Sequence, residues 1–262
     1  MTENNTGRFV WFELLTSDPE AAIAFYTNVL GWRTQAFAQG SEYTMFASSQ
    51  GPLAGVTRLP ELAKQAGAPP YWQANVEVAS VEASVANVKT LGGRVIHAEN
   101  VPDIGNFAII ADPQGAVISL FTPARPMEAH DSTKSGEFSW HELYTTDHTA
   151  AFTFYSAVLG WEQLGEHDMG PMGTYRLWGR NGTQLGGMMN MPAGMKGADG
   201  KAPPPAWMHY VTAVDFDATL DRAKRNHATV LNGPHDVPGG MRIVQMLDPQ
   251  GAAFALVSAP AS

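Results

Sequence analysis

The sequence predicts an α+β protein built from two tandem modules, each a pair of β-α-β-β-β units. Two observations predict this class: a long internal repeat, and short apolar runs of strand length that alternate with amphipathic segments of helix length. The composition supports a packed core, because hydrophobic residues make up 44% of the 262 residues and charged residues only 16%. Extended disorder requires the opposite balance.

The repeat is clearest in a segment that occurs twice. Trp11–Trp32 reads WFELLTSDPEAAIAFYTNVLGW, and Trp140–Trp161, 129 residues further along, reads WHELYTTDHTAAFTFYSAVLGW. The turn sequence DPQGA occurs at Asp112–Ala116 and again, 136 residues later, at Asp248–Ala252. The second copy is therefore a few residues longer than the first, and we expect the extra residues in the Gly- and Pro-rich loop 192–205.

A repeat of this length predicts two homologous modules. We place the first module at residues 1–124 and the second at residues 137–262. The linker between them, residues 125–136, is polar and contains proline, which is typical of linkers.

The first half of the first module predicts one β-α-β-β-β unit. The helix has Ser17 or Asp18 as a capping residue and Pro19 in its first turn, and Gly31 is well placed to end it. The strands of this unit are expected at residues 8–15, 32–37, 43–48 and 53–59.

The second half of the module predicts a second unit of the same kind. Its helix carries Val81, Val85, Val88 and Leu91 on one apolar face and stops at Gly92-Gly93. Its strands are expected at residues 71–78, 94–97, 107–111 and 117–121, with a hairpin turn at 112–115. The second module repeats this order, with helices at 149–159 and 216–225.

Charge and cysteine content exclude several classes of function. Lys and Arg total 16 against 25 Asp and Glu, a net charge of -9, so we expect no nucleic-acid partner. There is no cysteine, which excludes disulfides, thiolate nucleophiles and Cys-ligated metals. No run of about 20 apolar residues is present, and the N-terminus lacks the pattern of a signal peptide. We therefore expect no membrane partner and a cytoplasmic location.

Both copies carry Glu-Leu-x-Thr-x-Asp, then Phe-Tyr-x-x-Val-Leu-Gly-Trp, then Asp-Pro-Gln-Gly-Ala. These motifs resemble the vicinal oxygen chelate superfamily, which includes glyoxalase I, the bleomycin-resistance proteins and the extradiol dioxygenases. The resemblance covers nearly the whole chain. It implies two glyoxalase-like modules, each with its paired units in a half-open sheet that curls around a small-molecule cup.

The resemblance also implies where a divalent metal would be bound by His and Glu side chains. The three ligand positions of the family fall on Trp11, Gln73 and Ser119 in the first module, and on Trp140, Met208 and Ala255 in the second. None of them is a His or a carboxylate, and indole, thioether and methyl groups do not replace those donors. We therefore expect the usual metal site to be absent from both cups.

Glu13 and Glu142 are the candidate catalytic residues. Strand alternation places them on the same face as Trp11 and Trp140, and desolvation there would raise the pKa of a carboxyl that could then act as a base. The alternative is that each Glu has a structural role and anchors neighbouring backbone or Arg groups. The full set of candidate ligand-binding residues is Trp11, Glu13, Gln73, Asn75, Ser119, Trp140, Glu142, Met208 and Tyr210.

Other aromatic residues have two interpretations. Trp72 and Trp207 could line a cup together with Trp11 and Trp140, but we favour core packing for these two. His141 and His209 are expected on the strand face opposite the cup. A shift of one residue in the register would turn His209 inward, where it could form an unorthodox metal site with Glu142.

Two functions remain open. The first is a protein that binds a small aromatic or apolar metabolite in its cups and needs no cofactor. The alternative is an enzyme, either a lyase or isomerase of the glyoxalase type or a dioxygenase. It would use Glu13 or Glu142, with Zn, Ni, Fe or Mn in a non-standard site. In both cases we expect a small-molecule partner and a monomer or homodimer.

Overall fold

The computed structural model describes residues 5–37, 43–65, 67–192, 194, 200 and 202–259, except for the side chain of Leu62. The loop expected at 192–205 therefore lies partly outside the described residues. The first half of the chain contains β1 (Phe9–Thr16), α1 (Pro19–Leu30), β2 (Arg33–Ala36), β3 (Thr44–Ala47), β4 (Pro52–Arg58), α2 (Glu61–Gln65), β5 (Tyr71–Glu77), α3 (Val81–Thr90), β6 (Arg94–Val101), β7 (Gly105–Ala111) and β8 (Val117–Pro123).

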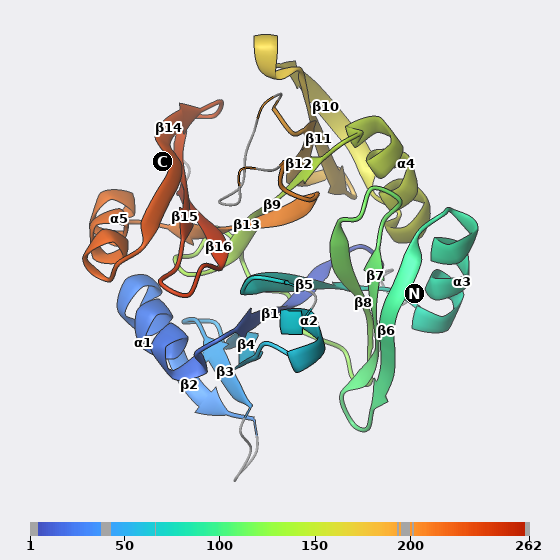
Figure 1. Cartoon of the computed structure of the whole chain (residues 1–262), viewed down its shortest axis with the longest axis horizontal. Coiled ribbons are helices and arrows are strands. Elements are labelled where there is room, and N and C mark those ends of the chain that lie inside the picture. Colours follow the sequence, from blue (N-terminus) through green and yellow to red (C-terminus); the bar gives the residue numbers. More distant parts are fainter. Residues whose placement is uncertain are drawn as a thin grey trace. The chain divides into compact units, whose positions relative to one another are not determined.

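The second half contains β9 (Phe138–Thr145), α4 (His148–Leu159), β10 (Glu162–Asp168), the 3-10 turn η1 (Gly170–Met172), β11 (Thr174–Arg180), β12 (Thr183–Asn190), β13 (Ala206–Ala213), α5 (Phe216–Arg225), β14 (Thr229–Val237), β15 (Met241–Leu247) and β16 (Ala253–Ser258). The predicted order of two β-α-β-β-β pairs is confirmed (Figure 1). The short helices α2 and η1 were not predicted, because segments of three to five residues are too short to show a helical period.

The long helices begin and end as the sequence indicates. Asp18, and not Ser17, caps α1: its carboxylate accepts a hydrogen bond from the Ala21 N–H at 3.1 Å. Asp147 caps α4 in the same way. Gly31 and Gly160 follow the two helices with φ of 70°, a left-handed conformation that suits glycine.

Each module forms one open eight-stranded sheet. The strand order is β2-β3-β4-β1-β5-β8-β7-β6 in the first sheet and β10-β11-β12-β9-β13-β16-β15-β14 in the second. Within each half, the first strand pairs in parallel with the last, as β1 does with β4 and β9 with β12. The curl of each sheet around a cup stays a prediction.

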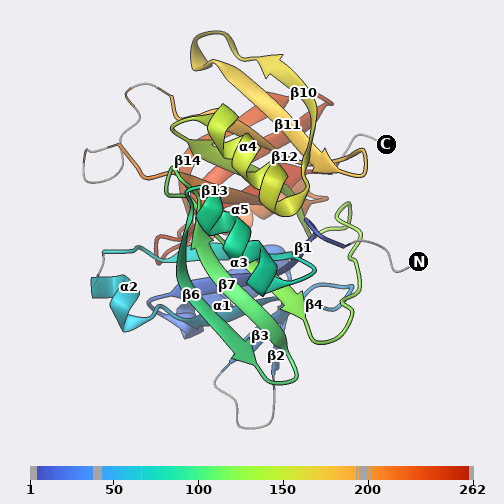
Figure 2. The ribbon, with the colours of Figure 1, turned by 90° about the vertical axis from the view of Figure 1, so that its right-hand side faces the viewer.

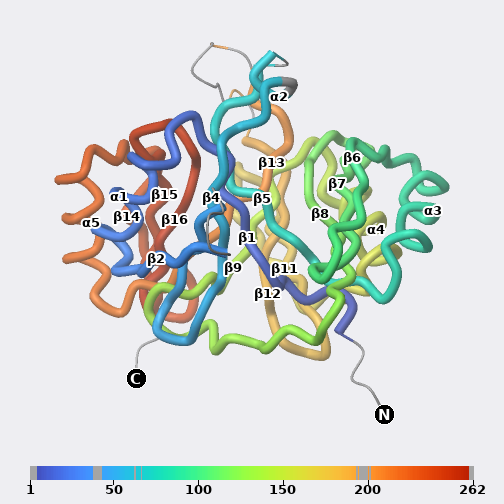
Figure 3. The backbone as a smooth tube through the Cα atoms, turned by 90° about the horizontal axis from the view of Figure 1, so that it is seen from below, coloured from blue at the N-terminus to red at the C-terminus, as the bar shows by residue number. Residues whose placement is uncertain are grey.

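The chain divides into two compact units, and each combines halves of both sequence modules. Unit 1 is Met1–Val10, Ala74–Glu128 and Trp140–Met208, and unit 2 is Trp11–Gln73, Ala129–Ser139 and His209–Ser262. In unit 2, α1 packs against α5; in unit 1, α3 packs against α4 (Figures 2 and 3). The boundaries of the sequence modules stay a prediction.

The repeated sequence motifs meet crosswise inside these units. In unit 2, Tyr26 on α1 donates its hydroxyl to Asp248 Oδ2 at 3.1 Å, and Trp72 Nε1 donates to the Tyr26 hydroxyl at 2.9 Å. In unit 1, Tyr155 on α4 accepts from Trp207 Nε1 at 3.3 Å, and burial first and the Asp112 charge second raise the pKa of Tyr155. In both units the tyrosine of the Phe-Tyr motif of one module therefore interacts with the aspartate of the Asp-Pro-Gln-Gly turn of the other.

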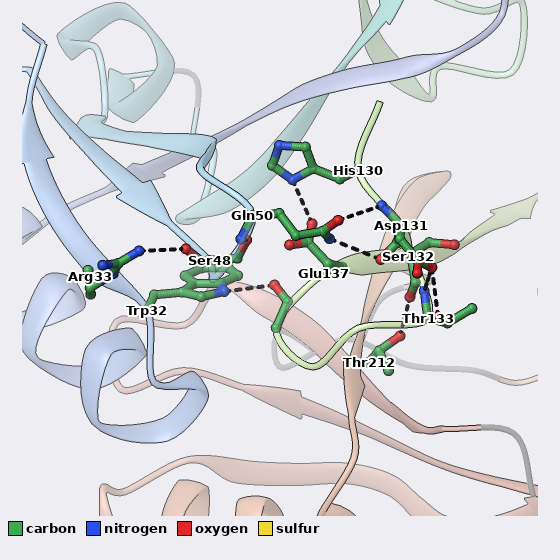
Figure 4. A network of polar contacts seen from close by, with 11 residues as sticks. Trp32, Arg33, Ser48, Gln50, His130, Asp131, Ser132, Thr133, Glu137 and Thr212 are labelled. Atoms are coloured by element: carbon green, nitrogen blue, oxygen red, sulfur yellow. Dashed lines mark hydrogen bonds and ion pairs between the residues drawn. The ribbon is translucent and has the colours of Figure 1, made fainter. Parts of the chain in front are cut away.

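The segment that joins the modules is held by hydrogen bonds within unit 2 (Figure 4). Trp32 Nε1 donates to the Gly136 carbonyl at 2.8 Å, and the Gln50 side chain bonds both the N–H and the carbonyl of Asp131. Thr212 on β13 donates to the carbonyl of Ser132. The counterpart of the Trp32 contact in unit 1 is a hydrogen bond from Trp161 Nε1 to the Gly7 carbonyl at 2.8 Å.

No helix among the described residues is long and apolar enough to cross a membrane.

Candidate functional site

A hydrogen-bonded cluster of three side chains lies on one face of the first sheet, in unit 2. Tyr43, just before β3, donates its hydroxyl to Glu13 Oε2 on β1 at 2.6 Å. Trp11 Nε1 lies 3.1 Å from the Tyr43 hydroxyl and 3.3 Å from Glu13 Oε2. We call Trp11, Glu13 and Tyr43 the first cluster. It confirms that Trp11 and Glu13 share a strand face.

The register of three strands brings this cluster together. Glu13 on β1 lies opposite Gly55 on β4, which in turn lies opposite Met45 on β3. Gly55 leaves the space above the sheet open, and the side chains of Tyr43 and Glu13 occupy it. A Cβ atom at position 55 would stand 1.9 Å from the Tyr43 hydroxyl and 2.8 Å from Glu13 Oε2. The cluster in this form therefore requires glycine opposite the carboxylate.

Burial controls the electrostatics of the first cluster. Glu13 as a residue is half-buried, but its Oε1 atom is shielded from solvent and has no hydrogen-bond partner among the described residues. Desolvation raises the pKa of Glu13 to about 7, against the opposing effect of the hydrogen bonds from Tyr43 and Trp11. Burial and the neighbouring Glu13 carboxylate also raise the pKa of Tyr43. A carboxyl that changes charge near neutral pH is suited to proton transfer.

The second sheet carries a matching cluster in unit 1, formed by Trp140, Glu142 and Tyr175, which we call the second cluster. Trp140 Nε1 donates to the Tyr175 hydroxyl at 3.0 Å, and that hydroxyl bonds Glu142. Burial first, and the Glu142 charge second, raise the pKa of Tyr175 well above its ordinary value. Gly187 lies opposite Glu142, and a Cβ there would stand 2.1 Å from the Tyr175 hydroxyl.

Reasoning from the sequence missed the tyrosine and the glycine of both clusters. A usable signal was present, because Tyr43 and Tyr175 are 132 residues apart, and Gly55 and Gly187 are separated by the same distance. When a tyrosine and a glycine recur at the same distance in the second repeat, they indicate that both repeats place these two residues in the same way.

The remaining candidate residues are placed as follows. Gln73 on β5 is buried, with 7% exposure, and takes no part in the hydrogen bonds of the first cluster. Asn75 and Ser119 are partners in the β5–β8 ladder, and the Ser119 hydroxyl is buried without a hydrogen-bond partner among the described residues. Met208 is half-buried, while Tyr210 is buried and accepts a hydrogen bond from Gln245 Nε2 at 2.6 Å.

The other two aromatic candidates pack against tyrosines, with Trp72 buried and Trp207 half-buried. Trp72 is buried against Tyr26, and Trp207 packs edge-on against Tyr155. This supports the preference for core packing at both positions.

Both strand histidines are buried among rings. His141 stacks on Phe9 at 3.7 Å between ring centroids, and His209 meets the ring of Phe12 edge-on at 5.2 Å, with Phe138 beside it. Desolvation lowers the pKa of His209 to about 3, so its imidazole is neutral at physiological pH.

The donor atoms do not fit the metal site that the motifs imply. The six family positions carry two indoles, an amide, a hydroxyl, a thioether and a methyl group. No group of three or more His, Asp or Glu side chains in the described part of the chain is arranged to hold a metal ion. In the first cluster, Glu13 Oε2 already accepts from Tyr43 and Trp11. Divalent metals of this family need imidazole and carboxylate donors.

An open pocket of about 260 Å³ lies elsewhere in unit 1. Its lining residues are Thr145, Thr146, Met191, Pro192, Gly194, Ala202 and Pro203. None of them belongs to either cluster, and none is a titratable side chain.

Comparison with known proteins agrees with the architecture. A family model described as "Glyoxalase/Bleomycin resistance protein/Dioxygenase superfamily" matches residues 137–256, and one described as "Bleomycin resistance protein-like N-terminal" matches residues 8–49. Among solved structures, the Mn(II)-bound glyoxalase from Novosphingobium aromaticivorans is similar in fold, with a TM-score of 0.66 and 15% identity over 98% of this chain and 83% of that one.

Two curated relatives align over nearly their whole length. The protein named "Putative glyoxylase CFP32" in Mycobacterium tuberculosis is 31% identical over 260 residues, covering 98% of this chain and 96% of that protein. The "Anthracycline biosynthesis protein DnrV" of Streptomyces peucetius is 31% identical over 271 residues, covering 98% of this chain and 95% of that protein. With the two-module fold and the repeated motifs, these matches show that the chain belongs to the glyoxalase, bleomycin-resistance protein and dioxygenase group, the vicinal oxygen chelate superfamily.

Proposed function

We propose that this chain binds a small aromatic or apolar metabolite at the sheet faces that carry the two clusters, without the usual metal of its superfamily. The observation that carries the proposal is the repeated cluster of Trp, Glu and Tyr. In each copy an indole and a phenol stand beside a carboxylate on a strand face. The resemblance assigns a metal-ligand position to the indole residue, Trp11 or Trp140. Such groups offer flat apolar surface with a polar edge, which suits aromatic ligands.

Two further features support an aromatic ligand. Phe37 is 50% exposed and lies edge-on to Tyr43, with 6.0 Å between ring centroids, which extends the aromatic surface of the first cluster. One of the relatives is named for anthracycline biosynthesis, and anthracyclines are aromatic compounds.

Binding of a neutral aromatic probe tests this function. We expect 2-methoxynaphthalene to bind the purified protein, measured by calorimetry and by a rise in the midpoint of thermal unfolding. Trp11→Ala and Trp140→Ala should each weaken binding at one site, whereas Phe107→Ala, on β7 and part of neither cluster, should not. Elemental analysis should find less than one equivalent of Zn, Ni, Fe or Mn per chain. A tightly held equivalent of any of these metals, or no binding of the probe, would overturn the proposal.

One observation favours a second candidate, an enzyme of the lyase or isomerase type that uses Glu13 for proton transfer. The carboxyl of Glu13 is desolvated, and its pKa of about 7 is matched to work at neutral pH. Turnover of a hemithioacetal by the purified protein, lost in Glu13→Gln and kept in Glu20→Gln on the exposed side of α1, would support it. Absence of turnover with and without added Mn(II), Ni(II), Zn(II) or Fe(II) would exclude this reaction.

A further inference from the structure

Three buried oxygen atoms at the candidate positions of the first module have no hydrogen-bond partner among the described residues. Ser119 Oγ on β8 lies in unit 1, and the other two lie in unit 2. The two in unit 2 are Glu13 Oε1 on β1 and Gln73 Oε1 on β5. Buried polar atoms in folded proteins nearly always have a partner, because an unpaired one keeps its desolvation penalty without any compensating bond. An unpaired atom on a candidate ligand-binding residue is therefore evidence for a group that the ligand supplies.

The second module has no such atoms at the matching positions. The hydroxyl of Tyr175 bonds Glu142. The residue that corresponds to Gln73, in the sequence after the paired Trp72 and Trp207, is Met208, which has no hydrogen-bonding oxygen. Further along β13, the Tyr210 hydroxyl is already bonded by Gln245 at 2.6 Å. At these matching positions, the polar side chains of the second module are thus bonded within the protein.

Not every unpaired oxygen in this chain indicates a ligand. Gln114 Oε1 and Gln250 Oε1 are also unpaired among the described residues, but they occupy the same place in the two DPQGA turns. Because the unpaired glutamine oxygen occurs in both turns, we attribute it to the turn structure and not to a ligand. Glu13 and Gln73 differ because their unpaired atoms occur in the first module alone.

We infer that the first module recognises an aromatic molecule that carries hydrogen-bond donors, hydroxyl or amino groups, which pair with Glu13 Oε1 and Gln73 Oε1, and that the second module does not bind these polar groups. This inference rests on the proposed aromatic-binding function. It adds that the ligand carries hydrogen-bond donors and that the first module recognises them. Both unpaired atoms are acceptors, so the complementary ligand groups are N–H or O–H donors. Because both atoms are buried, each bond discriminates more strongly between ligands than it would in water.

A pair of probes that differ in one donor tests the inference. 2-Naphthol has a hydroxyl donor, and 2-methoxynaphthalene has the same rings without it. We expect calorimetry to show tighter binding of 2-naphthol to the wild-type protein. Gln73→Met introduces the residue of the second module and should weaken 2-naphthol binding roughly 3- to 10-fold, the value of one hydrogen bond, with little effect on the ether. Gln114→Met is the matched control and should leave the ratio of the two affinities unchanged.

Stability gives an independent readout. Because Gln73→Met removes a buried unpaired acceptor, we expect its midpoint of thermal unfolding to equal or exceed that of the wild type. If this variant does not fold, Glu13→Gln serves instead: its carbonyl oxygen keeps the bonds from Tyr43 and Trp11, so an NH₂ group takes the place of Oε1 and cannot accept.

Three results would overturn the inference. They are equal affinities of the wild type for both probes, a Gln73→Met variant that binds 2-naphthol like the wild type, and a loss of the preference for 2-naphthol in Gln114→Met. Each of these leaves aromatic binding intact, so the proposed function survives. Failure of both probes to bind would instead remove the proposed function together with the inference.

Discussion

At the scale of single residues, the two glutamates show how the same motif can differ in chemistry. Glu13 and Glu142 occupy equal positions in the repeat and both have a tyrosine partner. Strand alternation and the neighbouring Trp were enough to predict a raised pKa, and the structure confirms it for Glu13. The unpaired oxygen of Glu13 was not predictable, because it depends on which atoms of other strands reach the carboxylate.

The titration of Glu13 should be visible in the pH dependence of stability. Its pKa is about 7 in the folded protein, above the ordinary 4.5, so the folded state binds more protons between these values. The free energy of unfolding should therefore fall as pH rises from about 4.5 to about 7, by at most about 3 kcal/mol from this group. In Glu13→Gln, the contribution of this group to the pH dependence of the free energy of unfolding should vanish. Urea unfolding at pH 5, 6, 7 and 8 measures it. A variant whose stability runs parallel to that of the wild type at all four values would show that Glu13 does not titrate there.

At the scale of elements, the sequence predicts long helices and regular hairpins well and exposed strands poorly. The helix capping residues Asp18 and Gly31 are local signals, and both were confirmed. Strand β6 continues to Val101, although it was expected to end at His97. Its second half is polar and exposed, so no apolar alternation marks it. The cross-strand pairing of Glu13 with Gly55 is equally invisible to local patterns, because it is fixed by register.

That register gives a prediction for the two glycines opposite the glutamates. In Gly55→Ala the new Cβ would lie 1.9 Å from the Tyr43 hydroxyl, so Tyr43 must move and its hydrogen bond to Glu13 is lost. We expect a loss of about 1–3 kcal/mol in stability and weaker binding of aromatic probes. Gly187→Ala should do the same in the second cluster.

Gly165→Ala on β10 is the matched control for the glycine variants. Its new Cβ would meet Leu177 at 3.5 Å, an ordinary contact, so little change is expected. Chemical denaturation measures the change in stability, and titration with an aromatic probe measures the change in binding. Gly55→Ala with wild-type stability and binding would mean that Tyr43 is not held over position 55.

At the scale of the whole molecule, the sequence predicts the two modules but not how their halves combine. Self-similarity shows what is repeated, and contacts between distant segments are not part of that signal. The structure places the helix motif of the first module and the Asp-Pro-Gln-Gly turn of the second in one compact unit, through Tyr26 and Asp248. Both motifs occur in both repeats because they pack against each other. Their recurrence therefore does not indicate a ligand site.

Removal of the Tyr26 hydroxyl tests this crosswise contact. In Tyr26→Phe, Asp248 Oδ2 loses its donor and Trp72 Nε1 loses its acceptor in a buried place, which should lower stability by about 1–3 kcal/mol. A double-mutant cycle with Asp248→Asn should show coupling between the two positions. Additive effects would indicate that the hydroxyl and the carboxylate do not interact in solution.

The same arrangement predicts the behaviour of an isolated first module, residues 1–124. In the full chain, α1 packs against α5 and Tyr26 bonds Asp248, and both partners come from the second half of the sequence. A single module therefore leaves the apolar face of α1 uncovered, and a second copy can supply the matching elements, α3 and the turn at Asp112. We expect residues 1–124 to form a homodimer, or to aggregate, and not to fold as a monomer. Light scattering after size exclusion gives the mass, and circular dichroism with thermal unfolding gives the folding state. A monomer with a cooperative transition like that of the full chain would show that the halves of one module suffice for each other.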